Sequence, residues 1–439
     1  MAVLERRSDN VSINGQVAEA GFNIQASAEA FEILSDRIYP NKIKAVVREL
    51  TTNAVDATID ARKVARIHSL VKQGRIEPSP LLYKTVVDEY TSVVSQVAII
   101  PEYETAILNI VSDNAAYLAK ELDTLYKFPN YDLSQWVEQA PQVHLPNRVE
   151  PWFAVRDFGT GLSHEFIMKL YVSYFWSDKK TSNDYTGCLG LGSKSPFAYT
   201  DHFTVTSYWN GEKRMYNAHL TNGFPSISIF VDEAGEPAVY PTDEPNGLEV
   251  KFAVKSSDFD EFSNEARRLY PYFKLQPKVV GNSNVSSYLE KIQKSKEDNT
   301  YFTLSGNSTI AWGFRRPNEY SNENGPRAIM GNIAYPIKLQ NEYGYDNVMQ
   351  RLLRSNIDIV FPVGTLQITP SREQLSYKES TIKAIETAFK QISTELAAKL
   401  CERIADASSL WEARCRASEL FHKGDFEGFA SLLSLNKLE

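Results

Sequence analysis

The spacing of apolar residues predicts a long helix that begins near Pro40 and runs to about His68. Within it, Glu49, Asn53 and Asp56 lie at positions i, i+4 and i+7, so they share one face of the helix. The remaining positions are apolar or small, namely Val46, Val47, Leu50, Ala54 and Ala57. A packed helix with a polar stripe implies a polar group bound against that stripe. The alternative is an ordinary solvent-facing stripe on a surface helix.

A first glycine-rich segment follows the strand-like run 152–155. It reads Val-Arg-Asp-Phe-Gly-Thr-Gly-Leu over residues 155–162. Asp157 stands at the end of the predicted strand, ahead of Gly159 and Gly161. This order can place a carboxylate in a pocket while the backbone turns closely around a ligand. A glycine-rich turn that binds nothing is the alternative.

A second glycine-rich segment reads Thr-Gly-Cys-Leu-Gly-Leu-Gly-Ser-Lys-Ser-Pro-Phe over residues 186–197. Its three glycines lead into Ser193 and Lys194. Such a loop suits backbone amides that converge on phosphate oxygens at the start of a helix. Taken singly, this segment is also compatible with a simple turn.

Hydrophobic periodicity elsewhere predicts an α+β protein. The runs 203–208, 213–220, 226–231 and 247–254 alternate as strands of an antiparallel sheet. Beyond residue 258 we expect helices at 259–275, 345–354 and 378–404, and strands at 301–304, 328–337 and 357–363. Two short helices are expected at 408–421 and 425–435.

These elements predict four regions. Residues 1–68 and 149–257 form the domain that carries the polar helix face and both glycine-rich segments. Residues 69–148 form an insertion whose runs 82–97 and 102–125 have helical periodicity and no catalytic signature. A second α/β unit spans 258–404, and a helical tail spans 405–439.

Composition narrows the class of protein. A chain of 439 residues, 43% of them hydrophobic, is long enough for two or three domain cores. The net charge of −8 argues against a protein that mainly coats nucleic acid, although local basic patches stay open. Three scattered cysteines predict neither a disulfide framework nor a zinc site. No apolar run approaches the roughly 18–20 residues of a membrane span, so only peripheral membrane association stays open.

Taken together and in this order, residues 48–57, 157–161 and 187–192 resemble the ATP site of the GHKL superfamily. Its members include DNA gyrase, the ninety-kilodalton heat-shock chaperone, histidine kinases and a mismatch-repair protein. The resemblance implies a two-layer α/β sandwich that binds ATP, followed by a transducer-like domain.

A closer resemblance links the chain to the RIIA rapid-lysis proteins of T-even-like bacteriophages. It rests on residues 41–57, 156–162 and 182–208, covers most of 22–255 and part of the C-terminal half, and leaves out 69–148.

The superfamily resemblance implies a role for each matching residue. Glu49 resembles the general base that polarises the attacking water, and Asn53 resembles the ligand of Mg²⁺. Asp157 resembles the carboxylate that accepts the adenine amino group, and Asp56 resembles a polar wall residue near the nucleotide. The backbone would approach the base at Gly159 and Gly161, and would wrap the phosphates at Gly187, Gly190, Leu191, Gly192 and Ser193.

One position departs from the family pattern. Leu248 stands where the chaperone and gyrase branches carry a threonine that supports the adenine site. The missing hydroxyl bears on the water network around the base and leaves the phosphate chemistry unaffected.

The segment 163–186 is predicted to be a lid over the nucleotide. It holds four aromatic residues, Tyr171, Tyr174, Phe175 and Trp176, beside a polar, turn-rich stretch. Lys179 within that stretch is a candidate phosphate contact, and a solvated surface lysine is the alternative.

A cationic residue from the second unit completes the expected site. Residues 366–375 resemble the Ser-Arg-Glu catalytic loop of the chaperone, and they make Arg372 the candidate for charge stabilisation in the transition state. The alternative is an arginine at a helix start that pairs with Glu373 or Asp358.

The resemblances together imply Mg²⁺-dependent ATP hydrolysis coupled to lid closure, with an ATP-dependent homodimer. The RIIA likeness implies a phage protein of the host cytoplasm that acts on a protein partner in lysis timing or in protection from host exclusion. A kinase would need a phosphoacceptor motif, and a topoisomerase subunit would need a DNA-cleaving tyrosine domain. The serious alternative is a non-hydrolysing, ATP-gated clamp that binds protein or DNA.

Overall fold

The computed structural model describes residues 39–72, 137–172, 192–273, 275–297, 311–314, 325–339, 347–369 and 373–422. Several predictions fall outside these residues. They are the helical runs of the insertion at 82–97 and 102–125, the strand at 301–304, the helix at 425–435, and the site candidates Lys179, Gly187, Gly190, Leu191 and Arg372.

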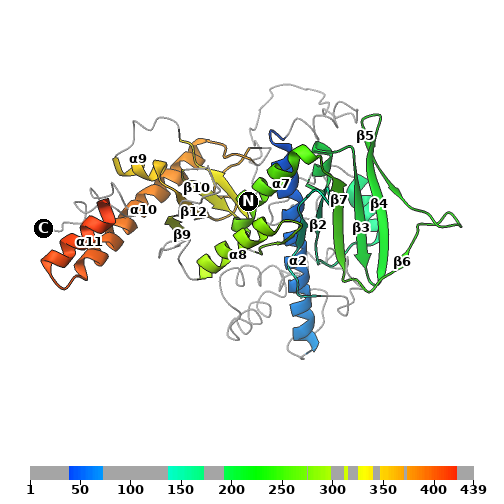
Figure 1. The fold of residues 1–439 in the computed structure, drawn as a ribbon, viewed down its shortest axis with the longest axis horizontal. Coiled ribbons are helices and arrows are strands. Elements are labelled where there is room, and N and C mark those ends of the chain that lie inside the picture. The colour runs from blue at the N-terminus through cyan, green and yellow to red at the C-terminus, as the bar shows by residue number, and fades with distance from the viewer. Residues whose placement is uncertain are drawn as a thin grey trace, which may run out of the picture.

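Among the described residues, eight strands form one sheet in the order β5-β4-β3-β7-β2-β1-β8, with β6 pairing to β4 (Figure 1). Their bounds are β1 Gln142–His144, β2 Trp152–Arg156, β3 His202–Trp209, β4 Glu212–Thr221, β5 Phe224–Ile229, β6 Tyr240–Pro241, β7 Gly247–Ala253 and β8 Lys278–Val280. The strands predicted at 203–208, 213–220, 226–231 and 247–254 are therefore present. The sheet is not wholly antiparallel, because β1 and β8 pair in parallel.

Two Asn-Gly turns fix the register of the central meander. Asn210 and Gly211 connect β3 to β4 with φ values of 51° and 80°. Asn222 and Gly223 connect β4 to β5 with φ values of 52° and 80°. Positive φ at both central residues is the signature of the two-residue type I′ turn, whose twist matches that of paired strands.

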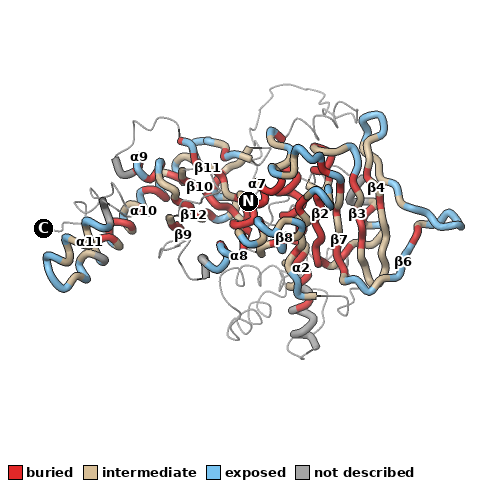
Figure 2. Tube along the Cα trace, in the orientation of Figure 1, coloured by how far each residue is buried: buried red, intermediate tan, exposed pale blue. Residues whose placement is uncertain are grey.

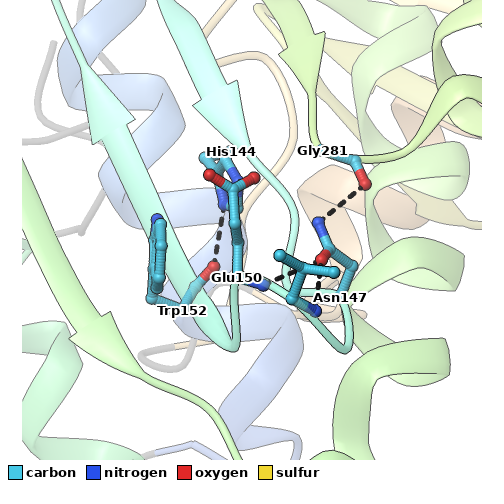
Figure 3. Close-up of polar contacts among 6 residues, drawn as sticks. His144, Asn147, Glu150, Trp152 and Gly281 are labelled. Atoms are coloured by element: carbon cyan, nitrogen blue, oxygen red, sulfur yellow. Dashed lines mark hydrogen bonds and ion pairs between the residues drawn. The ribbon is translucent and has the colours of Figure 1, made fainter.

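A turn held by side chains connects β1 to β2 (Figure 3). Asn147 Oδ1 accepts hydrogen bonds from the backbone N–H groups of Val149 and Glu150, both at 2.9 Å. Glu150 Oε2 lies 2.8 Å from His144 Nε2, and this hydrogen bond lowers the pKa of Glu150. The His144 ring on β1 also stacks on Trp152 of β2, so side chains of both strands hold the turn together.

Three helices cover one face of the large sheet (Figure 1). They are α2 Lys42–Lys72, α7 Phe259–Leu269 and α8 Ser283–Glu297. The N–H of Lys44 donates to Asn41 Oδ1 at 2.8 Å, so Asn41 caps the start of α2 near the predicted position. Figure 2 shows the buried residues concentrated between these helices and the strands. This arrangement confirms the predicted α+β class and its two-layer sandwich.

A second, four-stranded sheet has the order β11-β10-β12-β9. Its strands are β9 Ala311–Phe314, β10 Arg327–Met330, β11 Ile333–Pro336 and β12 Ile357–Phe361. Helices α9 Asn347–Arg354 and α10 Glu379–Ala405 pack on it, and α11 Leu410–His422 packs on α10. The helices predicted at 345–354, 378–404 and 408–421 correspond to these three.

Two predicted elements of this region have different bounds in the structure. The single strand predicted at 328–337 is a hairpin, because Gly331 adopts a φ of 61° and turns the chain between β10 and β11. The helix predicted at 259–275 ends at Leu269, where the 3₁₀ turn η6 Tyr270–Tyr272 begins. Pro271 explains this end, since proline has no N–H to continue the helical hydrogen bonds.

The two sheets belong to two hydrophobic cores. Helices α7 and α8 contribute Phe262, Leu269 and Leu289 to the core of the large sheet, which β8 also joins. The second core contains residues from Trp312 onward. The domain boundary predicted at residue 258 stays a prediction. The first hydrophobic core includes residues up to Leu289, and the second begins at Trp312.

Within the described ranges, the apolar stretches of the helices are too short to cross a lipid bilayer.

Candidate functional site

The described end of the second glycine-rich segment, from Gly192 onward, contacts the polar face of α2. Glu49 and Asp56 are buried and Asn53 is half-buried. A β-carbon on Gly192, the first residue of the 3₁₀ helix η4 Gly192–Ala198, would lie 3.0 Å from both Glu49 Oε2 and Asn53 Nδ2. The backbone of Gly192 therefore comes directly onto the polar face of α2. Ser193 follows it in the same turn.

The two oxygens of the Glu49 carboxylate have different neighbours, Arg48 for one and Gly192 for the other. Arg48 donates to Glu49 Oε1 from Nη2 at 2.8 Å and from Nε at 3.2 Å. The other oxygen, Oε2, is the one that faces Gly192. A carboxylate fixed in this way is aimed toward the space beside Asn53.

Arg48 is buried with only 1% of its surface exposed. Burial is the largest single effect on its pKa and lowers it, but the charge and hydrogen bond of Glu49, together with smaller contributions, raise the pKa of Arg48 above its usual value. Arg48 therefore stays a cation inside the protein.

The first glycine-rich segment fixes Asp157 at the end of β2. Its Oδ1 accepts hydrogen bonds from the N–H of Gly159 at 2.9 Å and of Leu248 at 3.1 Å. Leu248, which departs from the family pattern in its side chain, thus holds Asp157 through its backbone. Two backbone donors on one oxygen hold a carboxylate in a fixed orientation.

This segment also packs against α2. The N–H of Phe158 donates to Thr58 Oγ1 at 3.3 Å, and a β-carbon on Gly159 would lie 3.0 Å from Ala57 Cβ. Residue 57 lies eight residues beyond Glu49, which is about 12 Å along a helix axis. Gly159 therefore meets α2 beside Ala57, whereas Gly192 meets it at Glu49 and Asn53.

Gly161 and Gly247 are glycines for reasons of backbone geometry. Gly161 has a φ of 73°, and a β-carbon there would collide with the carbonyl oxygen of Tyr208. Gly247 has a φ of 142°, and a β-carbon there would collide with the carbonyl oxygen of Asp157. Both positions demand glycine whether or not a ligand binds nearby.

Arg156 holds the segment around Asp157 in place through its guanidinium, a role that the sequence reasoning missed. Its guanidinium lies 4.1 Å from the ring centroid of Tyr208 and 4.9 Å from that of Phe158. It also donates to the carbonyl oxygens of Asp157 and Pro245. Burial lowers the pKa of Arg156, opposed mainly by the charge of Asp157.

Lys194 is a second residue to which the sequence reasoning gave no role. Only 4% of its surface is exposed, and burial lowers its pKa to about 8. It follows Gly192 by two residues, so a buried amine lies in the turn that meets the polar face of α2. Its position directly after Gly-Leu-Gly-Ser was the signal available in the sequence.

These residues fit a nucleotide with a magnesium ion. An amide oxygen such as that of Asn53, completed by phosphate oxygens and water, is a normal coordination shell for Mg²⁺. A glycine backbone pressed onto the same face suits close approach of phosphate oxygens. Nowhere in the described part of the chain do three or more His, Cys, Asp or Glu residues gather as a metal site of their own.

No protein-family model matches the chain, and no curated protein matches it. Solved structures do match, among them the ATPase region of Saccharomyces cerevisiae topoisomerase II bound to ICRF-187 (dexrazoxane). That structure is 15% identical, with a TM-score of 0.35, and the match covers 60% of this chain and 79% of the other. A likeness at this level assigns neither ligand nor activity to this chain.

Proposed function

We propose that this protein binds ATP with Mg²⁺ and hydrolyses it at the polar face of α2. The observation that carries the proposal is the close approach of Gly192 to Glu49 Oε2 and to the Asn53 amide. This approach brings together a carboxylate held by Arg48, a neutral magnesium ligand and a half-buried glycine backbone. Hydrolysis of a phosphoanhydride depends on such positioning more than on covalent catalysis.

Each residue has a distinct task in this proposal. Glu49 Oε2 accepts a proton from the attacking water, while Arg48 keeps Oε1 occupied. Asn53 holds Mg²⁺, which when bound neutralises charge on the phosphates. Asp157 accepts the adenine amino group about 12 Å further along α2. Asp56 lines the wall between them.

The finer parts of the proposal rest on sequence resemblance. Lys179 and the glycines Gly187 and Gly190 close over the phosphates as part of a lid, and Arg372 approaches from the second unit when the lid closes. ATP binding favours this closed, homodimeric state by its greater affinity for it. The likeness to RIIA proteins supports a phage protein that acts on a protein partner in the host cytoplasm.

Phosphate release by Glu49 variants tests the hydrolytic step. Glu49→Gln should reduce phosphate release at least ~100-fold and leave ATP affinity within about threefold, because a base contributes about that much to rate and little to binding. Glu212→Gln is the matched control, since Glu212 forms a partly exposed ion pair with Arg214 on β4, in a different element from α2. Wild-type protein that binds ATP but releases no more phosphate than Glu49→Gln would be a clamp, and the enzyme proposal would fail.

The adenine contact is tested separately through Asp157→Asn. The Gly159 and Leu248 amides retain an acceptor oxygen in this variant, so folding should be preserved. ATP affinity should fall about 10–100-fold, the usual cost of losing a charged hydrogen-bond acceptor. Unchanged affinity by calorimetry would show that Asp157 does not bind the base.

A further inference from the structure

We propose that residues 230–241, which follow β5 and end with β6, form a docking hairpin. It inserts into an apolar recess of a protein partner whose rim carries lysine or arginine side chains. The hairpin lies away from the proposed ATP site, because β4, β3 and β7 separate β5 from β2, the strand that leads into Asp157. Docking there does not require hydrolysis at Glu49.

The docking hairpin projects from the edge of the large sheet (Figure 1). Within the described residues, β5 is the last strand on its side of the sheet, and the chain leaves the sheet after it. It turns back and rejoins the sheet at β6, which pairs with β4. The N–H of Ala238 donates to the carbonyl oxygen of Phe230 at 2.8 Å, and Val231 forms an antiparallel bridge with Pro237. The two arms of the hairpin are therefore paired with each other.

The turn at the tip of the docking hairpin is held by a side chain. Asp232 Oδ1 accepts hydrogen bonds from the N–H groups of Ala234 at 2.9 Å and Glu236 at 3.0 Å. Gly235 supplies the positive φ of 82° that the turn needs. A hairpin that is ordered before binding loses less conformational entropy when a partner binds it.

Exposed apolar side chains are concentrated on this hairpin. Phe230 is 57% exposed and Val231 is 59% exposed, and Val239 and Tyr240 are exposed as well. Figure 2 shows that exposed residues predominate where the hairpin projects. Single exposed apolar residues are normal on a protein surface, whereas a contiguous group of them marks an interaction site.

The four apolar side chains occupy both faces of the hairpin. Side chains alternate between the two faces along each arm. The bridge between Val231 and Pro237 therefore places Val231 and Val239 on one face. Phe230 and Tyr240 lie on the other face. A hairpin that only covers its own core needs a single apolar face, so apolar residues on both faces suit insertion into a recess.

The charge of this region indicates the chemistry of the partner. No lysine or arginine occurs between Arg214 and Lys251, whereas six acidic residues do, at positions 232, 233, 236, 243, 244 and 249. Two copies of the hairpin would repel each other, and so would the hairpin and the phosphates of nucleic acid. An apolar recess with a basic rim complements both the apolar side chains and the charge.

Photo-crosslinking identifies the partner in the cells that naturally produce the protein. The photoreactive amino acid p-benzoylphenylalanine replaces Phe230 in the full chain, and mass spectrometry identifies the crosslinked product. The matched control carries the same group in place of Val149, an exposed apolar residue on the turn between β1 and β2. We expect one protein partner to crosslink from position 230 and not from position 149.

Affinity measurements with the purified partner then test the chemistry of the contact. Phe230→Ala should weaken binding about 30-fold, the scale expected for a central aromatic residue of an interface. Glu233→Lys should weaken it about tenfold at low salt and much less at about 0.5 M salt, where charges are screened. Because both side chains are exposed, we expect both variants to fold.

Val149→Ala and Glu138→Lys are the matched controls for these two variants. Both change exposed residues near β1, of the apolar and the acidic kind respectively. Both should keep wild-type affinity for the partner.

Three results would overturn the inference. The first is a crosslinked product that is absent at position 230 or forms equally from position 149. The second is crosslinking to another copy of this chain. The third is a purified partner whose affinity is unchanged by Phe230→Ala or by Glu233→Lys. An absence of Glu49-dependent phosphate release in the wild-type protein would instead overturn the proposed hydrolysis and leave this inference standing.

Discussion

Gly161 and Gly192 occupy similar glycine-rich motifs, but a side chain at these two positions would meet different neighbours. At Gly161 a β-carbon would strike the Tyr208 carbonyl, in a backbone conformation with a φ of 73°. At Gly192 the nearest described atoms that it would meet are the ends of the Glu49 and Asn53 side chains, 3.0 Å away. The fold demands the first glycine, whereas the polar face of α2 demands the second. Glycines in similar motifs can therefore be required for two different reasons, backbone geometry in one case and neighbouring side chains in the other.

The largest effect should come from Gly161→Ala. Positive φ costs about 1–3 kcal/mol for a residue with a side chain, and the collision with the Tyr208 backbone adds to that cost. We expect a loss of about 3–5 kcal/mol in the free energy of unfolding, measured by urea denaturation.

Gly235→Ala is the control for Gly161→Ala. Gly235 has a φ of 82° but no neighbour within 4 Å of its β-carbon position, so it isolates the conformational cost. Equal losses in the two variants would contradict the importance of the Tyr208 contact.

A smaller effect is expected from Lys194→Met, which removes a buried charge beside Gly192. Burial lowers the pKa of Lys194 from 10.5 to about 8, so near neutral pH the folded state carries a charge that it disfavours. The stability of the variant relative to wild type should be about 3 kcal/mol greater at pH 7 than above pH 10.5, which is the free energy that corresponds to this pKa shift.

The stability difference between wild type and Lys194→Met depends on pH. Between pH 8 and 10.5 the unfolded wild-type chain binds more protons at this lysine than the folded chain does, so wild-type stability rises with pH. The gap between wild type and Lys194→Met should therefore shrink across that window in urea denaturation series. A gap independent of pH would show that Lys194 is not a destabilised cation.

The smallest effect on stability should come from Gly192→Ala. The neighbouring side-chain ends can shift by a few tenths of an ångström, so the free energy of unfolding should change by less than about 1 kcal/mol. Phosphate release should nevertheless fall about tenfold, because the new methyl group displaces Glu49 Oε2 and the Asn53 amide. Wild-type phosphate release in Gly192→Ala would contradict the view that the polar face of α2 requires this glycine.

The sequence predicted the parts of this molecule that depend on local spacing. The i, i+4, i+7 spacing placed Glu49, Asn53 and Asp56 on one helix face, and alternation located the strands of the central meander. The structure also brings Gly159 and Gly192 to that same helix. Such local patterns are visible because each element must bury its own apolar side.

The contacts that were missed join residues far apart in the chain. Thr51 was visible on the long helix, but its hydrogen-bond partner Tyr270 lies 219 residues further along the chain. Arg156 was visible next to Asp157, but its partners Tyr208 and Pro245 lie 50 to 90 residues away. The inclusion of α8 in the first core depends on the parallel pairing of β8 with β1, which no local pattern reveals.

The most direct test of the account is a crystal structure of Glu49→Gln with ATP and Mg²⁺. We predict phosphate oxygens against the Gly192 backbone, Mg²⁺ bound to the Asn53 side-chain oxygen, and the adenine amino group at Asp157. A nucleotide bound away from α2, or one whose phosphates lie nearer Asp157 than Asn53, would contradict it.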